Sequence, residues 1–109
     1  MFMQQSQLID LSTTEGCVLI NPEDILFIES IQRKRVIHTY QEKYVSYKSL
    51  EHMEVMLNQG YFARTHRSFI VNLKKIEKIV PYCRTSNKIV FYNYDEYAYL
   101  SKKYGHNLL

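Results

Sequence analysis

The sequence predicts a mainly β domain with one principal α-helix. Short runs rich in β-branched and aromatic residues recur along the chain, whereas only residues 49–59 repeat their apolar positions with helical spacing. Ten Tyr and five Phe supply all the aromatic side chains, and Tyr favours half-buried strands. With 109 residues, 46% of them hydrophobic and 23% charged, the chain is large enough for one domain with its own core.

The N-terminal quarter predicts a hairpin followed by a buried strand. Residues 7–11 and 17–20 are apolar runs separated by a polar stretch that ends in Gly16. Residues 21–24, Asn-Pro-Glu-Asp, favour a single helical turn with the Asn as N-cap. Residues 25–28 form a continuous apolar run, which is typical of a strand buried on both faces. Residues 1–6 are polar, and we expect them to be disordered or artificial in origin, so the domain spans residues 7–109.

The middle of the chain predicts a second hairpin and the helix. Residues 36–40 and 44–47 have strand composition and flank a polar turn. Ser49 is a suitable N-cap, and Gly60 is suited to end the helix as its C′ residue. Between them, one apolar stripe is formed by Leu50, Met53, Met56 and Leu57.

Residues 62–72, FARTHRSFIVN, combine basic and strand-forming residues. The composition of their second half predicts a buried strand, and their first half places basic groups at the start of that strand. Alternation along an extended chain predicts that Arg64, His66 and Ser68 share one face. A register break near His66–Ser68 would turn Arg67 outward at the rim.

The C-terminal third predicts three further strands. Residues 76–82 and 88–92 are joined through residues 83–87, and residues 97–100 form the last strand. Lys102 and Lys103 follow that strand directly.

Charge is distributed unevenly along the chain. Residues 1–60 hold five Lys or Arg against eight Asp or Glu, whereas residues 61–109 hold nine against three. The basic residues fall mostly in predicted connections, as a solvated surface would also place them. If the connections gather on one edge, however, they form a footprint for an anionic partner, most often a phosphate backbone. The residues concerned are Arg33, Lys34, Arg35, Arg64, His66, Arg67, Arg84, Lys88, Lys102 and Lys103.

The motifs of common enzymes and metal sites do not occur in the sequence. There is no HExxH, no Gly-rich phosphate loop and no metal-ligand spacing, so we expect neither an enzyme nor a cofactor. Ser68 lies beside His66 without an acid nearby in sequence to orient the ring. Cys17 and Cys83 match no metal spacing, which favours reduced thiols and a cytoplasmic protein without a membrane span.

At these residues the sequence resembles the LytTR-type DNA-binding domain, the output module of many bacterial response regulators. Residues 21–29 resemble its early "dIlyiE" segment, and residues 49–72 resemble its "sL…L…F.r.HrSyiVN" signature. Residues 101–104, Ser-Lys-Lys-Tyr, resemble its closing "vSr.y". The resemblance extends over about residues 8–109.

The resemblance implies an elongated fold of stacked antiparallel or mixed sheets, and a bacterial transcription regulator that reads major grooves of double-stranded DNA with loops. It implies a receiver domain outside this chain, unless the regulator is stand-alone, and a dimer on direct-repeat sites. By position, the groove contacts would be Lys34, Arg35, His66, Arg67, Lys102 and Lys103, and Lys88 would meet a phosphate. From the basic clusters we add Arg33, Arg64 and Arg84 as phosphate contacts.

One alternative stays open from the residues alone. The chain could be a protein-interaction module whose basic face binds an acidic partner and whose sheet edges accept an added strand.

Overall fold

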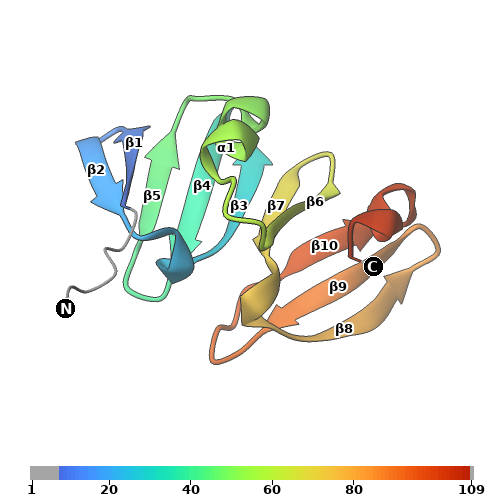
Figure 1. The fold of residues 1–109 in the computed structure, drawn as a ribbon. Helices are drawn as coiled ribbons and strands as arrows, with labels where there is room; N and C mark the ends of the chain where they lie inside the picture. The colour runs from blue at the N-terminus through green and yellow to red at the C-terminus, as the bar shows by residue number, and fades with distance from the viewer. Residues whose placement is uncertain (1–7, 109) are drawn as a thin grey trace.

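The described chain, residues 8–108 of a computed structural model, folds into three antiparallel sheets, one α-helix and three short 3-10 helices (Figure 1). The expectation for residues 1–6 lies outside this range. The strands are β1 (Ile9–Thr13), β2 (Gly16–Ile20), β3 (Ile25–Ile31), β4 (Lys34–Thr39), β5 (Lys43–Ser46), β6 (Phe62–His66), β7 (Phe69–Asn72), β8 (Ile76–Cys83), β9 (Ser86–Phe91) and β10 (Ala98–Ser101). The helices are η1 (Pro22–Asp24), α1 (Leu50–Met56), η2 (Leu73–Lys75) and η3 (Lys102–Leu108).

The central sheet has five strands in the order β5-β4-β3-β7-β6. Its middle strand, β3, begins with the apolar run Ile25–Ile28, and none of these four residues is exposed to solvent. A strand that is apolar on both faces must be covered on both faces. The predicted doubly buried strand is therefore confirmed, and it requires a separate core on each side of the sheet.

Two hydrophobic cores satisfy this requirement. On one face of the central sheet, α1 and the β1–β2 hairpin pack against its isoleucines. On the other face, the three-stranded sheet β10-β9-β8 covers the phenylalanine side of β3. The first core contains Leu11, Ile20, Ile25, Ile28, Ile37, Leu50, Met53, Leu57 and Ile70; the second contains Leu26, Phe27, Phe69, Val71, Ile89, Phe91, Ala98 and Leu100. This stacking gives principal extents of 47 × 36 × 24 Å, so the predicted elongated, layered fold is confirmed.

The N-caps predicted from the sequence are confirmed for η1 and α1. The Asn21 side chain accepts a hydrogen bond from the Glu23 backbone N–H before η1, and the Ser49 side chain accepts one from the His52 N–H before α1. The predicted end of α1 was wrong: the helix stops at Met56 and is followed by Leu57 as C-cap, not by Gly60. Leu57 leaves the helical conformation while its side chain stays in the first core.

Residues after the helix show where local pattern was insufficient. Gly60, with φ of +94°, serves the turn into β6 rather than the helix end. The segment after β10, expected as a simple strand exit, is the 3-10 helix η3. Within residues 8–108, no helix combines the length and apolar content that crossing a bilayer requires.

Residues 62–72 form the β6–β7 hairpin, not one strand with a basic mouth. The register shifts between Arg64 and His66, so that Thr65 is the extra residue of a β-bulge. Thr65 is fully buried, and its hydroxyl donates to the Tyr99 carbonyl over 2.8 Å. A register break was predicted near His66–Ser68, but it lies earlier, at Thr65, and interrupts the alternation that we expected to align Arg64 with His66.

Asn72, at the end of β7, connects the central sheet to the segment that leads into the three-stranded sheet. It is fully buried; its Nδ2 donates to the Ile25 carbonyl over 2.8 Å, and its Oδ1 accepts from the Lys74 backbone N–H over 2.9 Å. The first bond fixes the start of β3, and the second starts η2, which leads into the three-stranded sheet.

We predict that Asn72→Ala lowers the free energy of unfolding by about 2–3 kcal/mol, because it leaves the buried Ile25 carbonyl without its donor. Urea unfolding followed by circular dichroism measures this change. The exposed Asn58 provides the control, since Asn58→Ala should change stability by less than about 0.5 kcal/mol. Equal losses in the two variants would contradict the role of Asn72.

Candidate nucleic-acid interface

Four connections lie together at one side of the molecule. They are the β3–β4, β6–β7 and β8–β9 turns and the start of η3, which line the top and right of the view in Figure 1. Antiparallel strands return their turns to alternate ends, so these connections share one end while the β4–β5 turn, η1 and η2 lie at the other. We call this end, with its exposed side chains, the turn edge.

Three hydrogen bonds, two between backbone groups and one from a side chain to a backbone carbonyl, connect the parts of the turn edge. The Ser30 N–H at the end of β3 donates to the Ser68 carbonyl in the β6–β7 turn over 2.8 Å. Asn107 of η3 donates to the Arg64 carbonyl of β6 over 2.7 Å. The Lys102 N–H at the start of η3 donates to the Thr85 carbonyl of the β8–β9 turn over 3.0 Å. The four connections are therefore positioned relative to one another by direct bonds.

The β3–β4 turn consists of Gln32 and Arg33, both with positive φ, at 49° and 70°. Two left-handed residues in succession make the tight hairpin turn that matches strand twist, and this turn usually carries Asn or Gly. Two long polar side chains in this conformation are therefore locally strained. Arg33 is exposed at the tip, and the partly exposed Lys34 follows it at the start of β4.

Arg35 is held within the protein, although the sequence placed it among the groove contacts. Its Nη1 donates to the Ser30 hydroxyl over 3.0 Å, and its Nη2 donates to the carbonyls of Arg33 and Tyr47 over 3.3 Å each. These bonds fix the strained turn against β5 and the segment that follows it.

The β6–β7 turn presents His66 and Arg67. Arg67 is exposed, whereas His66 is partly buried and packs edge-on against Phe69. The Ser68 backbone N–H donates to Nδ1 of His66 over 3.0 Å. Since a backbone N–H can only donate, Nδ1 carries no proton and the neutral ring holds its proton on Nε2. Nε2 of His66 is thus fixed as a hydrogen-bond donor.

The remaining predicted cations occupy the three-stranded sheet and η3. Arg84, Lys102 and Lys103 are exposed at the turn edge. Lys88 lies in the middle of β9, with its Nζ 4.3 Å from the ring centre of Tyr97 and 5.2 Å from that of Tyr82. It therefore lies on the outer face of that sheet rather than at its turn.

Cys83, next to Arg84, is an exposed thiol whose pKa is lowered to about 7. The main cause is a hydrogen bond with the Thr85 hydroxyl, at 3.6 Å, with a smaller contribution from the Ser86 hydroxyl at 3.7 Å. This thiol lies at the end of β8, directly before the β8–β9 turn, so a partner of the turn edge would lie beside it.

Two candidate residues at the turn edge were not identified from the sequence. Tyr47 and Lys48 are exposed and follow β5, whose last residue, Ser46, pairs with Arg35. Together with Ser12 and Thr13 they line an open hollow of about 210 Å³. A single Lys outside any basic run gives no local signal, and only the strand register shows that it lies beside the β3–β4 turn.

A separate polar cluster lies between the central and three-stranded sheets. Glu29, His38 and Glu96 place possible metal-ligating atoms within 4.8 Å of one another. However, His38 Nε2 is 2.7 Å from a Glu29 oxygen, His38 Nδ1 is 2.7 Å from the Tyr94 hydroxyl, and Lys43 pairs with Glu96. Burial, with nearby carboxylates, raises the pKa of Tyr94 to about 12, so its hydroxyl keeps its proton. These groups satisfy one another, and we assign the cluster to inter-sheet packing.

These observations define a class of protein, namely a mainly β domain whose exposed cations gather at connections between its strands. Within that class, the family model described as the LytTr DNA-binding domain matches residues 15–109. The chain therefore belongs to the LytTR family of DNA-binding domains and is not an enzyme. This assignment favours DNA over the acidic protein partner that the residues alone left open.

Related proteins agree with the family. The sensory transduction protein LytT of Bacillus anthracis is 35% identical over 80 residues, which are 73% of this chain and 32% of that protein. The transcriptional regulatory protein YpdB of Escherichia coli K12 is 30% identical over 79 residues, 72% of this chain and 32% of that protein. The chain thus aligns with about a third of each relative.

A solved structure shows the same fold. It is the LytTr DNA-binding domain of a putative methyl-accepting/DNA response regulator from Bacillus cereus, with a TM-score of 0.77 and 25% sequence identity. The match covers 94% of this chain and 93% of that one, so the stacked-sheet architecture described above is that of the family.

His66 should make folding stability depend on pH. Burial, followed by the charges of Arg67 and Arg64, lowers its pKa below 6.5, so the unfolded chain binds this proton more readily than the folded one. The corresponding stability is fully present above pH 6.5 and is lost as the pH falls through the lowered, folded-state pKa. Urea unfolding at about pH 7.5 and pH 5 should show a smaller acid loss in His66→Gln than in the parent.

The exposed His52 on α1 provides the control, and His52→Gln should retain the acid loss of the parent. If His66→Gln also retains it in full, the lowered pKa of His66 is not the cause of the acid loss.

Proposed function

We propose that this chain binds double-stranded DNA sequence-specifically as part of a bacterial transcription regulator, with the turn edge entering the major groove. The observation that supports this most strongly is the hydrogen-bonded alignment of four connections, which brings exposed cations from distant parts of the sequence to one edge. The domain measures 47 Å in its longest dimension, whereas one turn of B-DNA spans about 34 Å.

The proposed groove contacts are the side chains that leave the turn edge toward solvent. Arg67 can form a bidentate pair with guanine, and Nε2 of His66 can donate to a base or phosphate acceptor. Lys34, Lys102 and Lys103 complete this set. Arg33, Arg84 and Lys88 are the proposed phosphate contacts, which set position without reading sequence. We propose supporting roles for Arg35 and Arg64, because their guanidinium groups bond to the protein's own carbonyls.

The relatives suggest how the chain is used. LytT and YpdB are named as sensory transduction and transcriptional regulatory proteins, and each is about three times longer than the aligned part. We propose that this domain is the cytoplasmic output module of a two-component response regulator whose receiver domain lies elsewhere in the full protein, and that it can occupy direct-repeat sites as a dimer.

Selection from a pool of random duplexes tests the proposed function. Repeated binding and amplification should enrich one sequence motif, because base contacts discriminate between sequences whereas phosphate contacts do not. A pool that is retained in a salt-dependent manner but shows no enriched motif would overturn the sequence-specific part of the proposal.

We predict that Arg67→Ala weakens binding to the selected duplex by about 1–3 kcal/mol and narrows the preference over a scrambled duplex, as loss of a good base contact does. Fluorescence anisotropy titration measures both affinities. Lys74 provides the control, since it lies in η2 at the opposite end and pairs with Glu23 at 3.0 Å. Lys74→Ala should leave the preference between the two duplexes unchanged, and an Arg67→Ala variant that behaves in the same way would exclude Arg67 as a base contact.

A further inference from the structure

Arg64 points into the protein rather than away from it. Its side chain is only 15% exposed, and all three of its guanidinium nitrogens have partners. Nε donates to the His66 carbonyl over 3.0 Å, and Nη2 donates to the Arg67 carbonyl over 2.5 Å. Nη1 forms an ion pair with Glu54 over 2.8 Å. One side chain therefore joins α1 to both carbonyls at the beginning of the β6–β7 turn.

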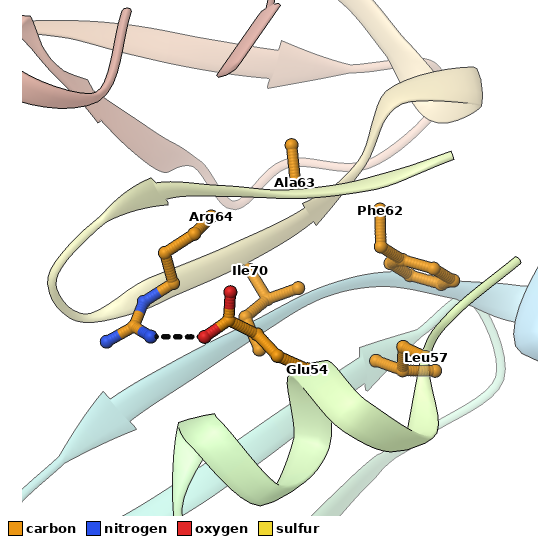
Figure 2. Close-up of a pocket in the computed structure, with 6 residues that line it drawn as sticks. All are labelled: Glu54, Leu57, Phe62, Ala63, Arg64 and Ile70. Carbon is orange, nitrogen blue, oxygen red and sulfur yellow. Dashed lines mark hydrogen bonds and ion pairs between the residues drawn. The ribbon is translucent and has the colours of Figure 1, made fainter. Parts of the chain in front are cut away.

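Glu54 is supplied by α1, which packs into the first core through Leu50 and Met53. Figure 2 shows the Glu54–Arg64 pair on one side of a small pocket, with the apolar side chains of Leu57, Phe62 and Ile70 beside it. This pocket, about 60 Å³, is too small for a metabolite, and its walls belong to α1 and the β6–β7 hairpin. Because Leu57 and Ile70 are buried in the same core, the backbone that carries Glu54 is packed against the hairpin, while the Glu54 side chain itself is 41% exposed.

The turn is thus restrained from both sides. Arg64 holds the carbonyls of His66 and Arg67 on the helix side, and Ser30 holds the Ser68 carbonyl on the β3 side. The Ser68 N–H in turn fixes the His66 ring. With its backbone held in this way, the turn directs the exposed Arg67 side chain outward.

We propose that Arg64 and Glu54 form a clamp that positions His66 and Arg67 for reading DNA, and that Arg64 is a positioning residue and not a phosphate contact. This inference rests on the proposed function, because the clamp matters to the extent that the turn reads bases.

Removing the negative charge of Glu54 tests the clamp, because electrostatics alone and the clamp predict opposite changes in DNA affinity. A carboxylate near a DNA-binding surface repels the polyanion, so removing it should strengthen binding if electrostatics alone acts. If Glu54 positions the turn, Glu54→Gln should instead weaken specific binding. Glu51 is a matched control: it lies one turn earlier on α1, its side chain is 76% exposed, and its oxygen forms only a long ion pair with Arg64 Nη1, at 3.7 Å, without a hydrogen bond.

The probes are the duplex enriched by selection and a scrambled duplex of the same composition. We expect Glu54→Gln to weaken binding to the enriched duplex about tenfold, the lower part of the range for one base contact, with little change for the scrambled duplex. Glu51→Gln should bind both duplexes equally well or more tightly. If Glu54→Gln behaves like Glu51→Gln, the clamp is excluded.

Arg64→Lys separates positioning from phosphate binding, because lysine keeps the charge but lacks the planar fork. The clamp predicts that this variant loses the preference for the enriched duplex while the dependence of affinity on salt stays that of the parent. If Arg64 instead contacts a phosphate, Arg64→Gln, which removes the charge, should weaken binding to both duplexes equally. It should also reduce the slope of affinity against salt concentration by about 0.9. That second pattern would overturn the proposal. Urea unfolding of each variant checks that the protein is folded under the conditions of the binding measurements.

A measurement without DNA distinguishes failure of the clamp from failure of the proposed function. In the free protein, the imidazole ¹⁵N shifts of His66 should show the Nε2–H tautomer, and Glu54→Gln should mix the tautomers and speed hydrogen exchange at the Ser68 amide. Glu51→Gln should do neither. Unchanged shifts and exchange in Glu54→Gln would exclude the clamp whether or not the selection enriches a motif.

Discussion

The architecture depends on one strand whose two faces are both apolar. β3 contributes Ile28 to one core and Phe27 to the other, so the central sheet has to be covered on both sides. The α1 helix and the β1–β2 hairpin cover one face, and the three-stranded sheet covers the other. Removing apolar area from water is the dominant favourable term in folding, and the two sheets that it brings together have turns on the same side of the molecule.

On that side of the molecule, hydrogen bonds to backbone carbonyls position the turns relative to one another. The turn carbonyls accept bonds from neighbouring connections or from two inward-pointing arginines. Buried or half-buried backbone groups need partners, and supplying those partners from other turns makes the edge a single unit. The cations that remain exposed, such as Arg33, Arg67 and Arg84, are consequently presented from a fixed backbone. Fixing the backbone before binding reduces the ordering that a partner would otherwise have to impose.

Basic residues that are close in sequence therefore differ in where their side chains point. Arg64 and Arg67 are three positions apart, yet one bonds to the backbone of the turn and the other leaves it. The same holds for Arg35 and Arg33 across the β3–β4 turn. In both turns, an inward arginine holds the carbonyl of the arginine that points outward. We infer that this pairing, rather than the number of positive charges, prepares the edge to discriminate between sequences.

The sequence by itself determined the fold class, the doubly buried strand, both N-caps and the family, because these depend on periodicity, on local hydrogen bonds and on a contiguous motif. It did not determine where α1 ends, that η3 is helical, or which arginines face inward. The inward direction of Arg64 depends on Glu54 from another element, and the contacts of η3 and of the bulge depend on distant partners: Asn107 for the Arg64 carbonyl and Tyr99 for Thr65. Local spacing carries no information about such contacts, which exist only after the two cores have brought the sheets together.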